Sequence, residues 1–265
     1  MRLSKLILCL ILWPCLAFAE SNYYMGASGV PSSAVADHCD AGCTGEADAD
    51  SFCVDSETGA AECEFTDTDG GTSTIAWNAS HIGSFCCTDG GAYALQITSV
   101  DTETNYTEKD LGADQAIYSQ QFYFLIHSET LADGESYPIC RTYSAAGAIG
   151  TYSFSVKDTS GTLNLRVLLN QDTDIDVTST KAITLDTWYR VRVYFDDEDA
   201  LVVNFSDCDG SNNELVVNAG AGDVGGTGIV RFVVFGSKAA ASGTVDFQID
   251  NAKGDDDTAI TTECE

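Results

Sequence analysis

The chain has 265 residues and carries 41 Asp and Glu against 12 Lys and Arg, a formal net charge of −29. This charge would repel a polyanion, so nucleic acid is excluded as a class of ligand. The length is sufficient for one all-β domain with a sizeable core.

The N-terminus has the three parts of a secretory signal peptide. Two basic residues precede the apolar run LILCLILWPCLAFA, which ends in the small-residue triplet Ala17-Phe18-Ala19. The run is shorter than the about 20 apolar residues of a membrane span, and Pro14 interrupts it. We therefore expect residues 1–19 to be removed and the mature chain to be secreted and extracellular, with no membrane span and 10 basic against 41 acidic residues, a net charge of −31.

Nine cysteines follow residue 19, and in an exported protein they are expected to form disulfides. They are Cys39, Cys43, Cys53, Cys63, Cys86, Cys87, Cys140, Cys208 and Cys264. A zinc site is the alternative, but Cys39-x3-Cys43 lacks a second close pair that includes histidine. Because nine is odd, we expect four disulfides and one thiol that is free or bonded to another chain. The last six of these cysteines are expected to tie strand ends and the C-terminal tail to the domain.

Residues 20–61 are rich in Ser, Ala, Gly and Asp without an apolar period, and we interpret them as a Cys-rich, loop-like N-terminal segment. In residues 62–257 short strand patterns alternate with turns rich in Gly, Asp and Ser, which is typical of an antiparallel sandwich. Residues 258–265 are expected to form a tail. The predicted strands are 92–98, 116–128, 150–158, 162–170, 188–196, 200–206, 213–218, 228–236 and 243–250.

Alternation of period two sorts these strands into two faces. Within residues 189–195, the pattern predicts that Tyr189, Val191, Val193 and Phe195 are core and that Arg190, Arg192 and Tyr194 point away from it. The same rule predicts further core residues: Phe122, Phe124, Ile126, Phe154, Val156, Leu163, Leu165, Val167, Leu169, Val245, Phe247 and Ile249.

Five segments follow one another in a recognisable order: GAYALQIT, YSQQFYFLI, YSFSVKDTSGTLNLRV, ITLDTWYRVRVYF and TVDFQIDNAKGDD. This order resembles the concanavalin A-like lectin/glucanase superfamily in its laminin-G-like form. Trp188-Tyr189-Arg190 and Ile249-Asp250-Asn251 are the most specific points, and the resemblance covers residues 62–257. It implies an all-β fold, a two-sheet antiparallel jelly-roll sandwich whose concave face cradles a glycan.

Members of this superfamily include both binding modules and enzymes, so the fold does not decide the function. A glycosidase needs two placed carboxylates, and the nearest string, residues 46–50, lacks the final Glu of the related glucanases. A polysaccharide lyase needs a Tyr or His base with an Arg or amide partner. His127 resembles half of the Q-[IV]-H signature of alginate lyases, but Leu125 replaces the glutamine. Convergence of His127, Tyr123 and Arg166 would still permit elimination.

Aromatic rings stack on the C–H faces of sugars, and planar groups such as Arg and Asn donate hydrogen bonds to them. We therefore expect ligand binding by the face away from the core. The candidates are Tyr123, His127, Arg166, Arg190, Arg192 and Tyr194. The alternative is that the arginines pair across strands with acids such as Asp196 or Asp197.

Two further kinds of site are open. The resemblance implies a structural calcium held by Glu64 or Asp67 together with Asp250, since hard cations take oxygen ligands. The triplets at Asn78, Asn105 and Asn204 are candidate N-glycosylation sites.

The sequence therefore favours a secreted, non-catalytic glycan-binding or adhesion module whose partner is an extracellular polysaccharide or glycoconjugate. The alternative is a structural subunit of an extracellular layer or fibre, which self-associates through the odd cysteine or the N-terminal segment. A polysaccharide lyase or glycosidase is the third possibility.

Overall fold

The computed structural model describes residues 52–54, 65–86, 92–144, 150–169, 175–197, 199–220, 229–256 and 260. All of them belong to one compact unit, Val35–Glu265. The predicted signal peptide lies outside the described residues, as do Glu64 and the side chains of Cys39, Cys43, Cys53, Cys63, Cys87 and Cys264. Among the described residues, no helix is long and apolar enough to cross a membrane.

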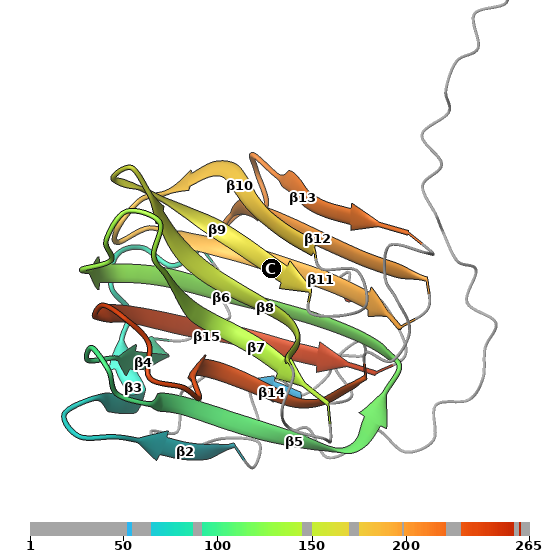
Figure 1. Cartoon of the computed structure of the whole chain (residues 1–265), viewed down its shortest axis with the longest axis horizontal. Helices are drawn as coiled ribbons and strands as arrows, with labels where there is room; N and C mark the ends of the chain where they lie inside the picture. Colours follow the sequence, from blue (N-terminus) through green and yellow to red (C-terminus); the bar gives the residue numbers. More distant parts are fainter. Residues whose placement is uncertain are drawn as a thin grey trace, which may run out of the picture. The chain divides into compact units, whose positions relative to one another are not determined.

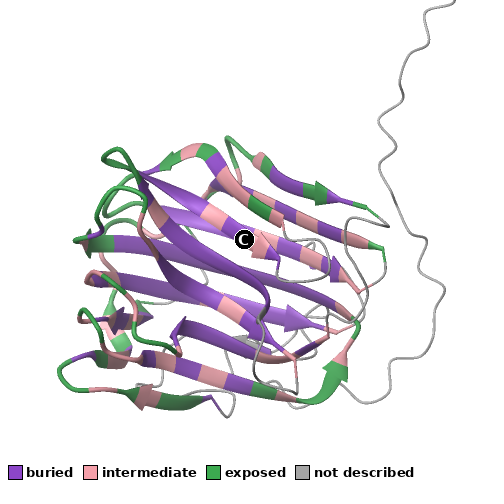
Figure 2. Ribbon diagram, in the orientation of Figure 1, coloured by how far each residue is buried: buried purple, intermediate pink, exposed green. Residues whose placement is uncertain are grey.

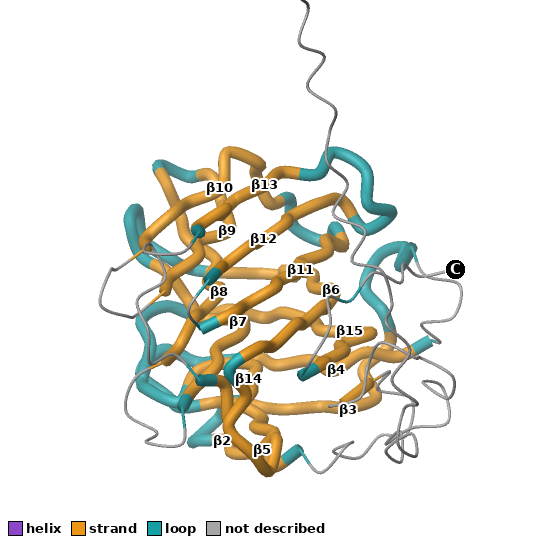
Figure 3. The backbone as a smooth tube through the Cα atoms, turned by 90° about the vertical axis from the view of Figure 1, so that its right-hand side faces the viewer, coloured by secondary structure: helices purple, strands orange, loops and turns teal. Residues whose placement is uncertain are grey.

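The strands form two antiparallel sheets, one lying in front of the other in Figure 1, so the predicted all-β, two-sheet jelly-roll sandwich is confirmed. The eight-stranded sheet has the order β13 (Glu214–Ala219), β12 (Ala200–Asp207), β11 (Trp188–Asp196), β6 (Ile117–Glu129), β15 (Val245–Asp255), β4 (Tyr93–Thr98) and β3 (Thr74–Ser80), with β1 (Phe52–Val54) also paired to β15. Figure 3 shows the successive strands of this sheet from the side. The seven-stranded sheet has the order β10 (Ile175–Ile183), β9 (Thr162–Leu169), β8 (Gly150–Thr159), β7 (Ser136–Tyr143), β14 (Val230–Ser237), β5 (Asn105–Gln115) and β2 (Thr66–Asp69).

The core lies between the two sheets and contains every residue that alternation assigned to it. Tyr189, Val191, Val193 and Phe195 belong to one buried cluster with the inward residues of β6, β8, β9 and β15. Phe122, for example, packs against Phe154 at 5.7 Å between ring centroids, which joins the two sheets. The predicted split of the strand faces is therefore confirmed.

A two-residue turn joins β8 to β9 where the sequence predicts one. Ser160 and Gly161 both have positive φ, 54° and 82°, and the flanking residues Thr159 and Thr162 are paired. Two central residues with positive φ form the hairpin turn that matches the twist of the adjoining strands. Gly161 N donates to the Asp158 carboxylate at 2.8 Å, which fixes the turn.

Carboxylates join the sheets along both of their long sides. On one side Glu214 of β13 accepts hydrogen bonds from the backbone N–H groups of Thr180 and Lys181 in β10, at 2.8 and 2.7 Å. On the other side Asp67 of β2 accepts from Trp77 Nε1 of β3 at 2.9 Å. The two sheets are thus connected by polar contacts as well as by the core.

Six strands were not predicted, namely β1, β2, β3, β5, β7 and β10. β1 falls inside the segment interpreted as loop-like, yet Phe52 and Val54 are buried in the core and pair with Gly254 and Ala252 of β15. A strand of three residues is too short to show alternation.

Cys140 corrects the prediction that it ties a strand end by a disulfide. It lies in β7 as a free thiol that is fully buried, with Gln120 Nε2 3.5 Å from its sulfur. Burial raises the pKa of this thiol, so it stays protonated. Since Cys140 faces the core, this free thiol is not accessible to another chain.

Native protein is expected to leave Cys140 unmodified by iodoacetamide, because alkylation requires an accessible thiolate. In denaturant the same residue should be alkylated. Mass spectrometry of the Cys140 peptide measures both states, and stoichiometric labelling of the native protein would contradict the buried position.

Candidate functional site

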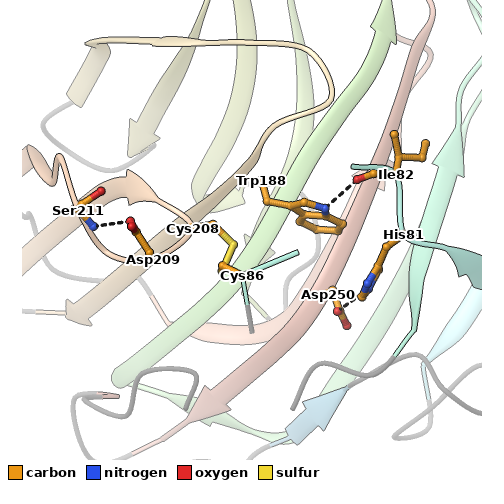
Figure 4. Close-up of a disulfide and its surroundings, with 8 residues drawn as sticks. All are labelled: His81, Ile82, Cys86, Trp188, Cys208, Asp209, Ser211 and Asp250. Carbon is orange, nitrogen blue, oxygen red and sulfur yellow. Dashed lines mark hydrogen bonds and ion pairs between the residues drawn. A yellow bond between two sulfur atoms is a disulfide. The ribbon is translucent and has the colours of Figure 1, made fainter. Parts of the chain in front are cut away.

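Residues 81–86, which we call the strap, follow β3 and cross the outer face of the eight-stranded sheet, the face that points away from the core (Figure 4). His81 Nε2 lies 2.9 Å from the Asp250 carboxylate on β15. Ile82 N donates to Gln248 Oε1 at 3.0 Å, and Trp188 Nε1 donates to Ile82 O at 2.9 Å. These bonds fix the strap over β15 and β11.

An apolar cluster fills the space under the strap. Tyr123, Leu125, Trp188 and Ala94 form a second buried cluster, separate from the main core. Phe85 of the strap packs on it, with ring centroids 4.7 Å from Trp188 and 5.5 Å from Tyr123. The strap therefore closes this half of the outer face.

A disulfide fastens the far end of the strap. Cys86 is bonded to Cys208, which follows β12, and the two residues are 122 positions apart in sequence. Both were predicted to tie strand ends by disulfides, and for these two cysteines this is confirmed; which cysteine pairs with which was not predicted. Figure 4 shows the bond beside the Asp209–Ser211 turn.

The rest of the outer face over β11, β12 and β13 is partly exposed, and we call it the open face. Cross-strand pairing forms two rows of residues across β13, β12 and β11. The first row is Leu215, Asn204 and Arg192. The neighbouring row is Asn218, Val202 and Tyr194. These strands show intermediate and exposed bands in Figure 2, whereas β6 and β15 are almost continuously buried. The open face thus consists of Arg192, Tyr194, Val202, Asn204, Leu215 and Asn218.

Gln121 of β6 positions the arginine of the open face. Arg192 Nε donates to Gln121 Oε1 at 2.6 Å, and Gln121 is fully buried. Among the described residues, Gln121 Nε2 and the neighbouring Ser119 Oγ have no hydrogen-bond partner. Unpaired buried polar atoms are rare in proteins and often mark places where a further polar group is bound.

Tyr194 stands beside Arg192 at the edge of the open face. Its hydroxyl is 3.5 Å from the Asp196 carboxylate. Partial burial, followed by the charge of Asp196, raises the pKa of the phenol, so the ring stays neutral at physiological pH. A neutral ring suits stacking on a sugar.

A bulge in β15 adds a residue that alternation did not place here. The pairing with β6 shifts between Asp250 and Lys253, and Asn251 within the bulge has a φ of 43°. Lys253 is thereby paired with Gln121 and aligned with Arg192 across β6, although it is buried. Bulges often turn a side chain to the opposite face in this way.

Of the six predicted ligand residues, Arg192 and Tyr194 lie on the open face. Tyr123, Arg190, Arg192 and Tyr194 share the outer face, although Tyr123 and Arg190 are buried. His127 lies four residues beyond Tyr123 along β6, where it pairs with Asp186 at 2.7 Å, and this hydrogen bond raises its pKa.

Arg166 corrects the predicted grouping, because it lies on β9 of the other sheet. It is bound to Asp176 of the adjacent strand at 2.7 Å. His127, Tyr123 and Arg166 therefore do not converge, as elimination by these three residues would require. Arg166 follows the alternative of cross-strand ion pairs instead.

The residues expected to hold calcium are separated. Asp67 lies on the seven-stranded sheet, where its carboxylate is bound to Trp77, and Asp250 lies on the other sheet with His81. In the part of the chain that the structure describes, no three His, Cys, Asp or Glu side chains are grouped for a metal ion. The calcium site stays a prediction.

The candidate glycosylation sites differ in accessibility. Asn105 is fully buried, and its amide donates to the backbone oxygens of Thr74 and Thr98 at 3.1 and 3.0 Å. A buried side chain has no room for a glycan, so this candidate is corrected. Asn78 is exposed and Asn204 partly exposed.

Sequence reasoning missed the strap, Gln121 and Leu215 as parts of this region. Gln121 shares the parity of Tyr123, so extending the alternation of β6 by one more step would have placed it on the outer face. Leu215 gave no such signal, because by alternation it shares the parity of the buried Val217, and its exposure of 51 % is known only from the structure. Alternation does not show which loop covers a sheet, so it could not reveal the strap.

No protein-family model matches the sequence, and neither does any curated protein sequence. The solved structures similar to the chain include the alginate lyase from Klebsiella pneumoniae, with 7% identity and a TM-score of 0.48 over 69% of this chain and 86% of that chain. The binding domain of botulinum neurotoxin DC in complex with rat synaptotagmin II has 9% identity and a TM-score of 0.47, over 76% of this chain and 46% of that chain. A carbohydrate esterase from the Shiga toxin-encoding bacteriophage phi24B has 14% identity and a TM-score of 0.45, over 72% and 88%.

Likenesses of this strength carry no argument about activity or ligand. The two-sheet antiparallel sandwich is consistent with the concanavalin A-like fold. The laminin-G-like form remains a prediction from the sequence.

Proposed function

We propose that the open face binds an acidic saccharide without catalysis, as the binding surface of a secreted module. The observation that carries this proposal is the fixed position of Arg192, whose Nε is held by the buried Gln121 at 2.6 Å between Tyr194 and Asn204. A guanidinium group recognises a carboxylate through paired hydrogen bonds, and it does so best when its orientation is fixed in advance.

The neighbours of Arg192 have the chemistry of a sugar site. Tyr194, Val202 and Leu215 offer apolar surface to the C–H faces of a ring, and Asn204 and Asn218 offer amides for its hydroxyl groups. Three strands at a spacing of about 4.8 Å make the face about 10 Å wide. This width suits two linked rings of an oligosaccharide.

Two acids at the end of β12, Asp207 and Asp209, do not have the electrostatics of a glycosidase general acid. Hydrolysis needs a carboxylic acid with a raised pKa. Desolvation alone would raise the pKa of Asp207, but hydrogen bonds from Lys181 and Asn212 lower it overall. Hydrogen bonds from Ser211 lower the pKa of Asp209. Both groups therefore lack the property of a general acid.

Arg192→Ala is expected to weaken binding of an oligouronate by about 10- to 100-fold, because the loss of a charge-assisted hydrogen bond costs about 1.5–3 kcal/mol. Calorimetric titration of the mature protein with oligouronates of defined length measures this change. Arg231→Ala is the control, since Arg231 pairs with Asp110 on the other sheet and should leave the affinity unchanged.

Equal affinity of the wild type and Arg192→Ala would overturn the site. A chelator added to the same titration tests whether calcium is required. Release of unsaturated uronates by the wild type, followed by their ultraviolet absorbance, would replace the binding proposal with elimination.

A further inference from the structure

Asn204 lies in the middle of the open face and begins the triplet Asn204-Phe205-Ser206. In β12 it is aligned with Arg192 on one side and with Leu215 on the other. Its Oδ1 accepts a hydrogen bond from Asn213 Nδ2 at 3.0 Å. This bond orients the amide of Asn204.

The asparagines of the other two triplets differ from Asn204 in accessibility or in distance from Arg192. Asn105 is fully buried with its amide bonded twice, whereas Asn78 is exposed on β3. Asn78 and Asn204 are five strands apart in the sheet, or about 24 Å. Asn78 is therefore accessible but remote from Arg192.

We propose that Asn204 is an N-glycosylation site and that its glycan occupies the open face, so that a glycosylated chain is closed to a saccharide ligand. The second part rests on the proposed function. The donor is a lipid-linked oligosaccharide. Asn204 Nδ2 loses a proton and bonds to the anomeric carbon, and the glycosyl–phosphate bond breaks as the lipid diphosphate leaves.

The glycan must be transferred to Asn204 before the chain folds, and the folded protein can then accommodate it. Phe205 and Ser206 are buried in the finished strand, so the triplet is readable only in the unfolded chain. Once folded, the first sugar of the glycan would stand beside Arg192, since directly paired residues of antiparallel strands have Cα atoms about 4.5–5.5 Å apart. The glycan would thus cover the group that the ligand needs.

The test compares three proteins secreted by a host that attaches N-glycans: the wild type, Asn204→Gln and Asn78→Gln. Mass spectrometry of peptides reports occupancy of each asparagine. Phenylglyoxal labelling of Arg192, followed by peptide mass, reports access to the open face without any ligand. We expect a glycan on Asn204, labelling of Arg192 several-fold slower in the wild type than in Asn204→Gln, and no change in Asn78→Gln relative to the wild type.

An unmodified Asn204 would overturn the proposal whatever the state of Asn78, and so would equal labelling of Arg192 with and without the Asn204 glycan. Titration with oligouronate then separates the two proposals. If Arg192 is protected by the glycan but wild-type protein made in a host that attaches no N-glycans also fails to bind, the glycosylation site stands and the proposed saccharide function is wrong.

Discussion

Replacing both Cys86 and Cys208 by alanine is expected to lower the free energy of unfolding by about 2–5 kcal/mol, the usual effect of losing a native disulfide. The bond links residues 122 positions apart and so restricts the unfolded chain strongly. It also fastens the strap over Trp188 and Tyr123. Urea denaturation of both proteins measures the change.

Ser84→Ala is the matched control for this experiment. Ser84 lies in the same strap with its side chain exposed, so its replacement should stay within about 0.5 kcal/mol of the wild type. If the double variant were as stable as Ser84→Ala, the strap would not depend on its disulfide.

Gly236→Ala is expected to destabilise the protein by about 2–6 kcal/mol. Gly236 has a φ of 93°, a conformation that costs about 1–3 kcal/mol for a residue with a side chain. A Cβ here would also collide with the backbone oxygen of Asn105 in β5, and such overpacking costs about a further 1–3 kcal/mol. Thermal or urea unfolding gives the size of the effect.

Gly161→Ala separates the two contributions. Gly161 has a φ of 82°, but a Cβ at this position would meet no atom within 4 Å. Its replacement should cost the conformational part alone. Equal losses for both variants would show that β5 moves aside freely at Gly236.

The fold could be predicted from the sequence where a strand buries one apolar face. β11 alternates Tyr189, Val191, Val193 and Phe195 with polar residues, and all four are core. β5 was not predicted because its buried positions hold Asn105, Thr107 and Lys109, which carry no apolar signal. In β7, Pro138 precedes a shift in register and weakens the strand pattern.

The site was harder to predict because it depends on which strands become neighbours. Alternation placed Arg192 and Arg166 correctly relative to their own strands, but the topology puts β11 and β9 in different sheets. The bulge at Asn251 reverses the face of Lys253, which no alternation rule anticipates. The course of the strap depends on contacts such as His81 with Asp250, between residues 169 positions apart.

Glu214 protects an edge of the seven-stranded sheet against the addition of a strand from another molecule. β10 is an edge strand with a bulge between Thr178 and Ala182, and an exposed edge normally recruits a strand from another molecule. The carboxylate of Glu214 already occupies the N–H groups of Thr180 and Lys181, so an incoming strand would have to displace it. Fibre growth by strand addition along β10 is therefore opposed by the fold itself, and any such assembly would have to start from a different edge.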